Sequence, residues 1–80
     1  MKEMPEMDYI IRTRIANVLV ECRKEKELTQ AELAKIIGST PTTVATWEQG
    51  KSMPSLQTLY RLAKFYQKSM DYMYGEEKKD

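Results

Sequence analysis

The segment from Leu28 to Lys51, LTQAELAKIIGSTPTTVATWEQGK, contains two helix start signals that are separated by a very short connection. Thr29 begins a T-x-x-E capping box, which is a signature of a helix N-terminus. Gly38 offers the left-handed backbone conformation that commonly ends a helix. Thr40 then caps a second helix with Pro41 at its first position, where the missing N–H costs no hydrogen bond. Because so short a connection excludes parallel packing, the two predicted helices must cross steeply.

Helical spacing of apolar residues accounts for the rest of the chain. A first helix is predicted to start after Asp8, and the two helices described above follow it. Ser55 and Ser69 are predicted to cap a fourth and a fifth helix. The predicted inward residues are Ile11, Ile15, Val18, Leu19, Cys22, Ala31, Leu33, Ala34, Ile37, Val44, Trp47, Leu56, Leu59, Leu62, Ala63, Tyr66, Met70 and Met73. No alternating β-branched run indicates a strand, so an all-α domain of five helices is expected.

The composition excludes several classes of function. Eighty residues suit one small domain, here taken as residues 1–80. The chain has no histidine and one cysteine, Cys22, which falls on a core stripe and is interpreted as a buried residue rather than a reactive thiol. We therefore expect no enzyme, no metal, no cofactor and no small-molecule ligand. No apolar run approaches a membrane span and the N-terminus is not a secretion signal, so a cytoplasmic protein is expected.

The charge is unevenly distributed along the chain. The formal net charge is only +1, but the residues before Arg12 carry one base and three acids, and those after Gly75 carry two bases and three acids. The segment 12–75 therefore carries +4. A mildly basic centre permits binding of a polyanion without demonstrating it.

The tight helical pair has two interpretations on spacing alone. It is an ordinary corner of a helical bundle, or it is a DNA-binding unit whose first helix braces on the backbone while the second enters the major groove. The segments TQAELA, WEQGK and PSLQTLYRLAK, in this order around Gly38, resemble the helix-turn-helix of phage Cro and CI repressors, the XRE family. The similarity covers residues 12–75, with the helix-turn-helix at 29–49. It implies a lambda-repressor-like domain that reads double-stranded DNA with residues 40–49.

The resemblance also implies which residues meet DNA. Gln30 matches the glutamine that opens the bracing helix and bonds a phosphate in the family. The full predicted set is Gln30, Thr40, Pro41, Thr42, Thr43, Thr46, Gln49, Lys51 and Ser52. Arg23 and Glu48 align with a partly buried ion pair of some relatives, whose role is structural. Trp47 is expected in the core, with base stacking as the less favoured alternative.

The predicted reading positions differ from those of many relatives because their side chains are short. Threonine offers one hydroxyl and one methyl, whereas a bidentate Arg or Gln pair discriminates bases by about 1–3 kcal/mol. A single copy should read its half-site weakly, so we expect a homodimer on an inverted repeat. Phe65, Tyr72 and Tyr74 lie off the predicted core stripes and suggest a contact surface, with Met4, Met7, Tyr9 and Ile10 as its cover in the same chain or in a partner. Scattered surface aromatics are the alternative.

The sequence thus predicts a DNA-binding transcription regulator, of which a repressor is the expected type. The alternative is a protein–protein interaction module on the same fold, favoured by the short reading side chains and the low net charge. The residues do not distinguish a phage regulator from a mobile-element regulator or an antitoxin-like autorepressor, and they leave the operator and the target genes open.

Overall fold

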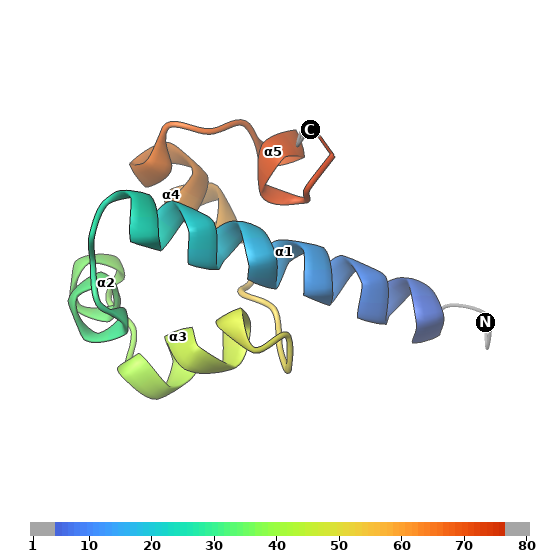
Figure 1. The fold of residues 1–80 in the computed structure, drawn as a ribbon, viewed down its shortest axis with the longest axis horizontal. Helices are drawn as coiled ribbons and strands as arrows, with labels where there is room; N and C mark the ends of the chain where they lie inside the picture. The colour runs from blue at the N-terminus through green and yellow to red at the C-terminus, as the bar shows by residue number, and fades with distance from the viewer. Residues whose placement is uncertain (1–4, 77–80) are drawn as a thin grey trace.

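The computed structural model describes residues 5–76 and contains five helices in that range, with no strand. They are α1 (Pro5–Glu25), α2 (Gln30–Ile37), α3 (Pro41–Glu48), α4 (Leu56–Tyr66) and α5 (Met70–Met73). Helix α1 crosses the molecule, with α3 on one side and α4 and α5 on the other (Figure 1). Its N-terminal turns project beyond the other helices. The all-α fold with five helices that the sequence predicts is confirmed.

The start and stop signals act where the sequence places them. At α2, the Glu32 N–H donates to Thr29 Oγ1 at 3.0 Å and the Thr29 N–H donates to Glu32 Oε1 at 2.8 Å, so both halves of the capping box form. Gly38 ends α2 with a φ of +79°, which a residue with a Cβ adopts only with strain. Thr40 then caps α3 through the Thr43 N–H. Figure 1 shows α2 nearly end-on and α3 from the side, so the two helices cross steeply.

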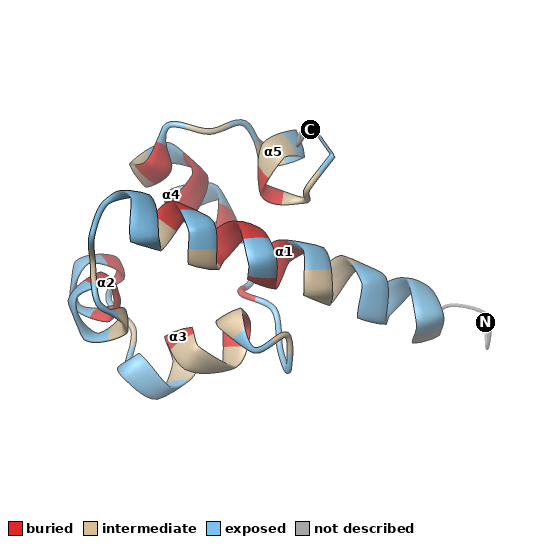
Figure 2. Ribbon diagram, in the orientation of Figure 1, coloured by how far each residue is buried: buried red, intermediate tan, exposed pale blue. Residues whose placement is uncertain are grey.

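The core forms where the helices face one another (Figure 2). Leu62 and Met73 are fully buried, and Cys22 is buried as expected. The buried apolar side chains of residues 5–76 are Ile15, Ala16, Val18, Leu19, Cys22, Leu33, Ala34, Ile37, Val44, Trp47, Leu59, Leu62, Ala63, Tyr66 and Met73. Every helix contributes at least one of them, so a single core holds all five together.

Several predictions about the helices are wrong. Helix α1 starts at Pro5, so Asp8 lies within its first turns instead of capping it; proline suits a first turn, which needs no N–H donor. Ala31 and Leu56 are exposed, although Leu33 and Leu59 in the same first turns of α2 and α4 are buried, so only one side of each first turn faces the core. Ile11 and Met70 are only half-buried at the edge of the core.

The aromatic residues near the C-terminus are also placed differently from the prediction of an exposed patch. Phe65, Tyr72 and Tyr74 are half-buried and pack against the core. The ammonium groups of Lys26 and Lys68 lie over the Phe65 and Tyr72 rings, 5.3 and 4.6 Å from their centres. Met4 lies outside the described residues. These three aromatic residues therefore extend the core and do not form a free contact surface.

Tyr66 is buried in the core with a hydroxyl that has no hydrogen-bond partner among the described residues. Burial raises the pKa of this phenol above its ordinary value of about 10. The folded chain therefore keeps this proton at a pH where the unfolded chain releases it. Stability that Tyr66 contributes is complete below pH of about 10 and is lost as the pH rises further.

The Tyr66→Phe variant is expected to be more stable than the parent chain by about 1 kcal/mol, because it removes a buried polar group that lacks a partner. Urea unfolding at neutral pH measures this difference. Repeating the unfolding at about pH 10.5 should widen the gap, since phenylalanine does not ionise. A phenylalanine variant that is less stable than the parent at both pH values would show that the hydroxyl is bonded in solution.

Candidate nucleic-acid interface

Helix α3 packs one face against the core and exposes the other face to solvent. Val44 and Trp47 are buried in the core, while Pro41, Thr42 and Gln49 are exposed. The arrangement follows from helical spacing, because residues three apart share one face and the residues between them point elsewhere. The sequence prediction that Trp47 belongs to the core agrees with its position. The outward side of α3 is therefore free of the core.

A network of three side chains joins α1, α2 and α3. Arg23 Nε donates to Glu48 Oε2 at 2.7 Å and Arg23 Nη2 donates to Glu48 Oε1 at 2.9 Å, which makes a two-pronged ion pair. The side chains are 13% and 4% exposed. Arg23 Nη1 also donates to the Leu28 carbonyl at 2.7 Å. The hydrogen bonds to Glu48 raise the pKa of Arg23 above its ordinary value, so the guanidinium remains charged.

Gln30 belongs to the same network. Its Nε2 donates to Glu48 Oε1 at 3.0 Å, so the first residue of α2 is tied to the last residue of α3. The amide therefore has a fixed position, and its carbonyl oxygen and second N–H remain available. Sequence reasoning assigned Gln30 to DNA alone and missed this contact, because no local signal links two residues that lie 18 positions apart.

The threonines of α3 differ in how much of their side chain is available. Thr40 caps the helix and its hydroxyl donates to Thr43 Oγ1 at 2.9 Å. The Thr46 hydroxyl donates to the Thr43 carbonyl at 2.7 Å and lies 3.0 Å from Ser52 Oγ, and Thr46 is half-buried. Within residues 5–76, the Thr42 side chain is exposed and makes no hydrogen bond. Thr42 is thus the α3 threonine whose hydroxyl is free for an outside partner.

Two cations, Lys51 of the loop after α3 and Arg12 of α1, lie at the end of α3. Lys51 and Ser52 are exposed. Gly50 has a φ of +76° and turns the chain, so that the Lys51 N–H donates to the Thr46 carbonyl at 3.0 Å. Arg12 of α1 reaches the same loop, where its Nε donates to the Gly50 carbonyl at 3.1 Å. Sequence reasoning did not include Arg12, because only the fold brings α1 to the end of α3.

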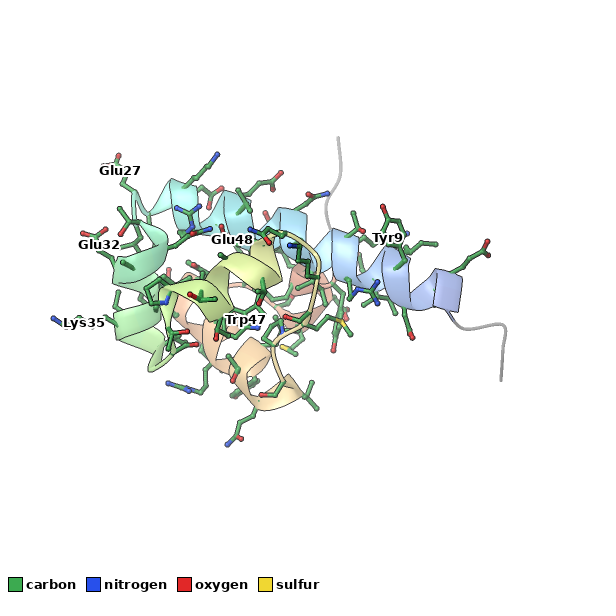
Figure 3. The ribbon with its side chains drawn as sticks, turned by 90° about the horizontal axis from the view of Figure 1, so that it is seen from below. Tyr9, Glu27, Glu32, Lys35, Trp47 and Glu48 are labelled. Atoms are coloured by element: carbon green, nitrogen blue, oxygen red, sulfur yellow. The ribbon has the colours of Figure 1, made fainter. Side chains whose placement is uncertain are left out.

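All the predicted DNA-contacting residues lie on three neighbouring pieces of chain. Gln30 opens α2, the residues from Thr40 to Gln49 flank or form α3, and Lys51 and Ser52 follow it. Figure 3 views the molecule from the side of α3, with Trp47 and Glu48 labelled. The surface offers hydroxyls, an amide and cations, which suits phosphates and base edges. Among the described residues there is no group of side chains that could hold a metal ion, and each helix is too short or too polar to cross a bilayer.

Comparison with known proteins gives one matching family model and several similar proteins. The model of the helix-turn-helix family HTH_3 matches residues 19–73. The chain is 35% identical over 52 residues to multiprotein-bridging factor 1a of Arabidopsis thaliana, covering 65% of this chain and 37% of that protein. It is 41% identical over 46 residues to the cryptic phage CTXphi transcriptional repressor RstR of Vibrio cholerae, covering 58% of this chain and 41% of that protein.

The fold agrees with a solved structure as well. The crystal structure of an HTH_3 family transcriptional regulator from Vibrio cholerae superposes with a TM-score of 0.74 at 26% identity, covering 88% of this chain and 39% of that one. The chain thus spans about two fifths of the length of these relatives. The similarity concerns the helical unit that carries the surface described above.

Proposed function

The chain belongs to the helix-turn-helix family HTH_3, and on that premise we propose that it is a transcription regulator that binds double-stranded DNA by placing α3 in the major groove. The observation that carries the proposal is the orientation of α3. Its Val44 and Trp47 are buried, so Pro41 and Thr42 stand outward at the helix N-terminus. The N-terminal residues of a reading helix are the ones that reach base edges.

Each outward residue has a role in this proposal. Thr42 reads bases through its hydroxyl and methyl. The DNA phosphates on either side of the groove are bound by Gln30, Thr40, Thr43 and Lys51. The remaining members of the surface are Pro41, Thr46, Gln49 and Ser52. The hydroxyls of Thr46 and Ser52 already form a hydrogen bond with one another, which stabilises the loop. Only the remaining hydrogen-bonding capacity of these two oxygens is available to DNA.

We further propose that the chain acts as a homodimeric repressor. One threonine hydroxyl supplies a neutral hydrogen bond with a net value of about 0.5–1.5 kcal/mol, which discriminates weakly. Two copies on an inverted repeat nearly double that discrimination, with half-site centres roughly 34 Å apart. The name of RstR, a transcriptional repressor, supports the direction of regulation.

A second candidate function is a protein–protein interaction module on the same fold. One observation favours it: a relative that is 35% identical carries the name multiprotein-bridging factor. The two functions differ in their dependence on salt. DNA affinity should fall steeply with salt concentration, in proportion to the number of phosphates that the protein neutralises. A selection of bound sites from random DNA, followed by a salt titration on the enriched site, separates them. No enriched sequence would favour the interaction module.

The variants Lys51→Ala and Thr42→Ala are expected to affect DNA binding differently. Losing Lys51 should weaken binding to every sequence alike and reduce the log–log salt slope by about 1. Losing Thr42 should change the preference at one base pair per half-site, by roughly 1 kcal/mol or less, and leave the salt slope unchanged. Affinities for the selected site and for single-base variants of it measure both effects. Identical sequence profiles for parent and Thr42→Ala would remove Thr42 from the reading surface.

A further inference from the structure

Helix α4 has an exposed apolar face that nothing in the described chain covers. Leu56 and Tyr60 lie one turn apart and are 69% and 52% exposed, while Leu59 and Leu62 of the same helix are buried. Lys64, one further turn along, holds its ammonium 5.4 Å from the centre of the Tyr60 ring. We call Leu56, Tyr60 and Lys64 the α4 face. Leu56 is the most exposed large apolar residue of residues 6–76, and only Tyr9 lies between it and Tyr60 in exposure.

The surroundings of the α4 face are basic. Between Glu48 and Asp71 the chain contains no acidic residue. The basic residues in this interval are Lys51, Arg61, Lys64 and Lys68. Arg61 is partly committed, since its Nη2 donates to the Ile37 carbonyl at 2.9 Å. A partner with both apolar and acidic side chains therefore suits this face best, because a basic partner would be repelled.

The same chain carries a segment of the required kind. The N-terminal turns of α1 contain the exposed apolar residues Met7, Tyr9 and Ile10 together with the exposed acids Glu6 and Asp8. These turns project away from the rest of the molecule (Figure 1), and Tyr9 lies on the projecting part (Figure 3). We call residues 6–10 the α1 tip. Met7, Tyr9 and Ile10 are 47%, 62% and 41% exposed, so the described chain leaves a large part of each side chain uncovered.

The α1 tip cannot reach the α4 face of its own chain. Helix α1 is continuous from Pro5 to Glu25, and Ile15, Val18 and Cys22 of the same helix are buried in the core. A helix held in this way directs its first turns outward and does not fold back. The match of apolar area and opposite charge is therefore available only between two molecules.

We propose that the α1 tip of one copy docks on the α4 face of a second copy, and that the second copy returns the same contact. A two-fold arrangement satisfies both surfaces of both chains and closes the assembly as a dimer. Met7, Tyr9 and Ile10 cover Leu56 and Tyr60, and Glu6 and Asp8 lie near Lys64. The inference rests on the homodimer proposed above and names the surfaces that form it.

Charge reversal on the two surfaces tests this arrangement. One variant carries Glu6→Lys and Asp8→Lys, and the other carries Lys64→Glu. Each variant alone brings like charges together at both contacts, so we expect its self-association to weaken roughly tenfold or more. A mixture of the two variants pairs opposite charges at both contacts and should associate as the parent chain does. Sedimentation equilibrium of the full chain at micromolar concentration measures all three samples.

Matched controls change the same charges elsewhere on the surface. Glu25→Lys and Lys35→Glu reverse exposed charges on α1 and α2 outside both surfaces, and they should leave the association constant unchanged. A monomeric parent chain would overturn the proposal. A parent dimer that the tip and face variants do not weaken, or a mixture that does not recover, would overturn these surfaces while leaving a homodimer in place. Affinity for a single DNA half-site tests α3 separately, so a failure of DNA binding is not confused with either result.

Discussion

Replacing Glu48 by alanine is expected to lower the free energy of unfolding by about 3–5 kcal/mol. The Glu48 side chain is 4% exposed and accepts two hydrogen bonds from Arg23 and one from Gln30. Its removal leaves the Arg23 guanidinium largely buried with only the Leu28 carbonyl as a partner. A small domain has a total stability of about 5–15 kcal/mol, so much of the population would unfold at moderate temperature. Thermal and urea unfolding followed by circular dichroism measure the loss.

A double variant separates the effect of losing the Arg23–Glu48 ion pair from the effect of leaving the Arg23 charge buried without a partner. Arg23→Met combined with Glu48→Leu removes both charges and keeps comparable volume, so it should recover most of the stability that Glu48→Ala loses. If the double variant is as unstable as Glu48→Ala, lost packing and not an unpaired charge explains the effect. If Glu48→Ala is as stable as the parent, the ion pair contributes nothing in solution.

Replacing Trp47 by alanine is expected to be similarly severe, with a loss of about 3–5 kcal/mol. The indole is 7% exposed and, with Val44, is the part of α3 that enters the core. Its removal leaves a cavity between α3 and α1, so the surface that carries Thr42 would lose its fixed position. Equilibrium unfolding in urea, monitored by far-ultraviolet circular dichroism because the only tryptophan is removed, measures this loss.

The variant Trp47→Phe distinguishes a core residue from one that stacks on bases. Phenylalanine fills part of the indole volume, so this variant should lose less stability than Trp47→Ala. Under conditions where it is folded, its DNA affinity should equal that of the parent. A folded Trp47→Phe protein with much weaker DNA affinity would instead assign Trp47 to the nucleic-acid surface.

The fold was largely predictable because its signals act over short distances. The capping box at Thr29, the left-handed Gly38 and the Thr40-Pro41 start depend only on residues within one or two turns. Apart from the start of α1, where Pro5 and not Asp8 opens the helix, the wrong predictions fall where a position depends on neighbours from elsewhere in the chain. Leu56 obeys the apolar spacing of α4 but is exposed, whereas Leu59 one turn along the helix is buried.

The candidate site was less predictable. Its composition follows from the resemblance, but the state of each side chain follows from contacts. Thr42 and Thr46 are the same residue type on one short helix, and only Thr46 meets Ser52 and the Thr43 carbonyl. Helical spacing treats the two alike, so it assigned both to the reading surface. The half-burial of Tyr72 and Tyr74 was missed for the same reason, since α1 and α5 come together only in the folded chain.

The sequence by itself determined the five helices, the turn at Gly38 and the inward face of α3, because backbone capping and apolar periodicity are local properties of the chain. The tertiary structure alone decided that Gln30 is held by Glu48, that Arg12 reaches the Gly50 carbonyl, and that Leu56 and Tyr60 stay uncovered. Hydrogen bonds between residues 18 and 38 positions apart, and the exposure of a helix face, exist only after separate helices have packed together.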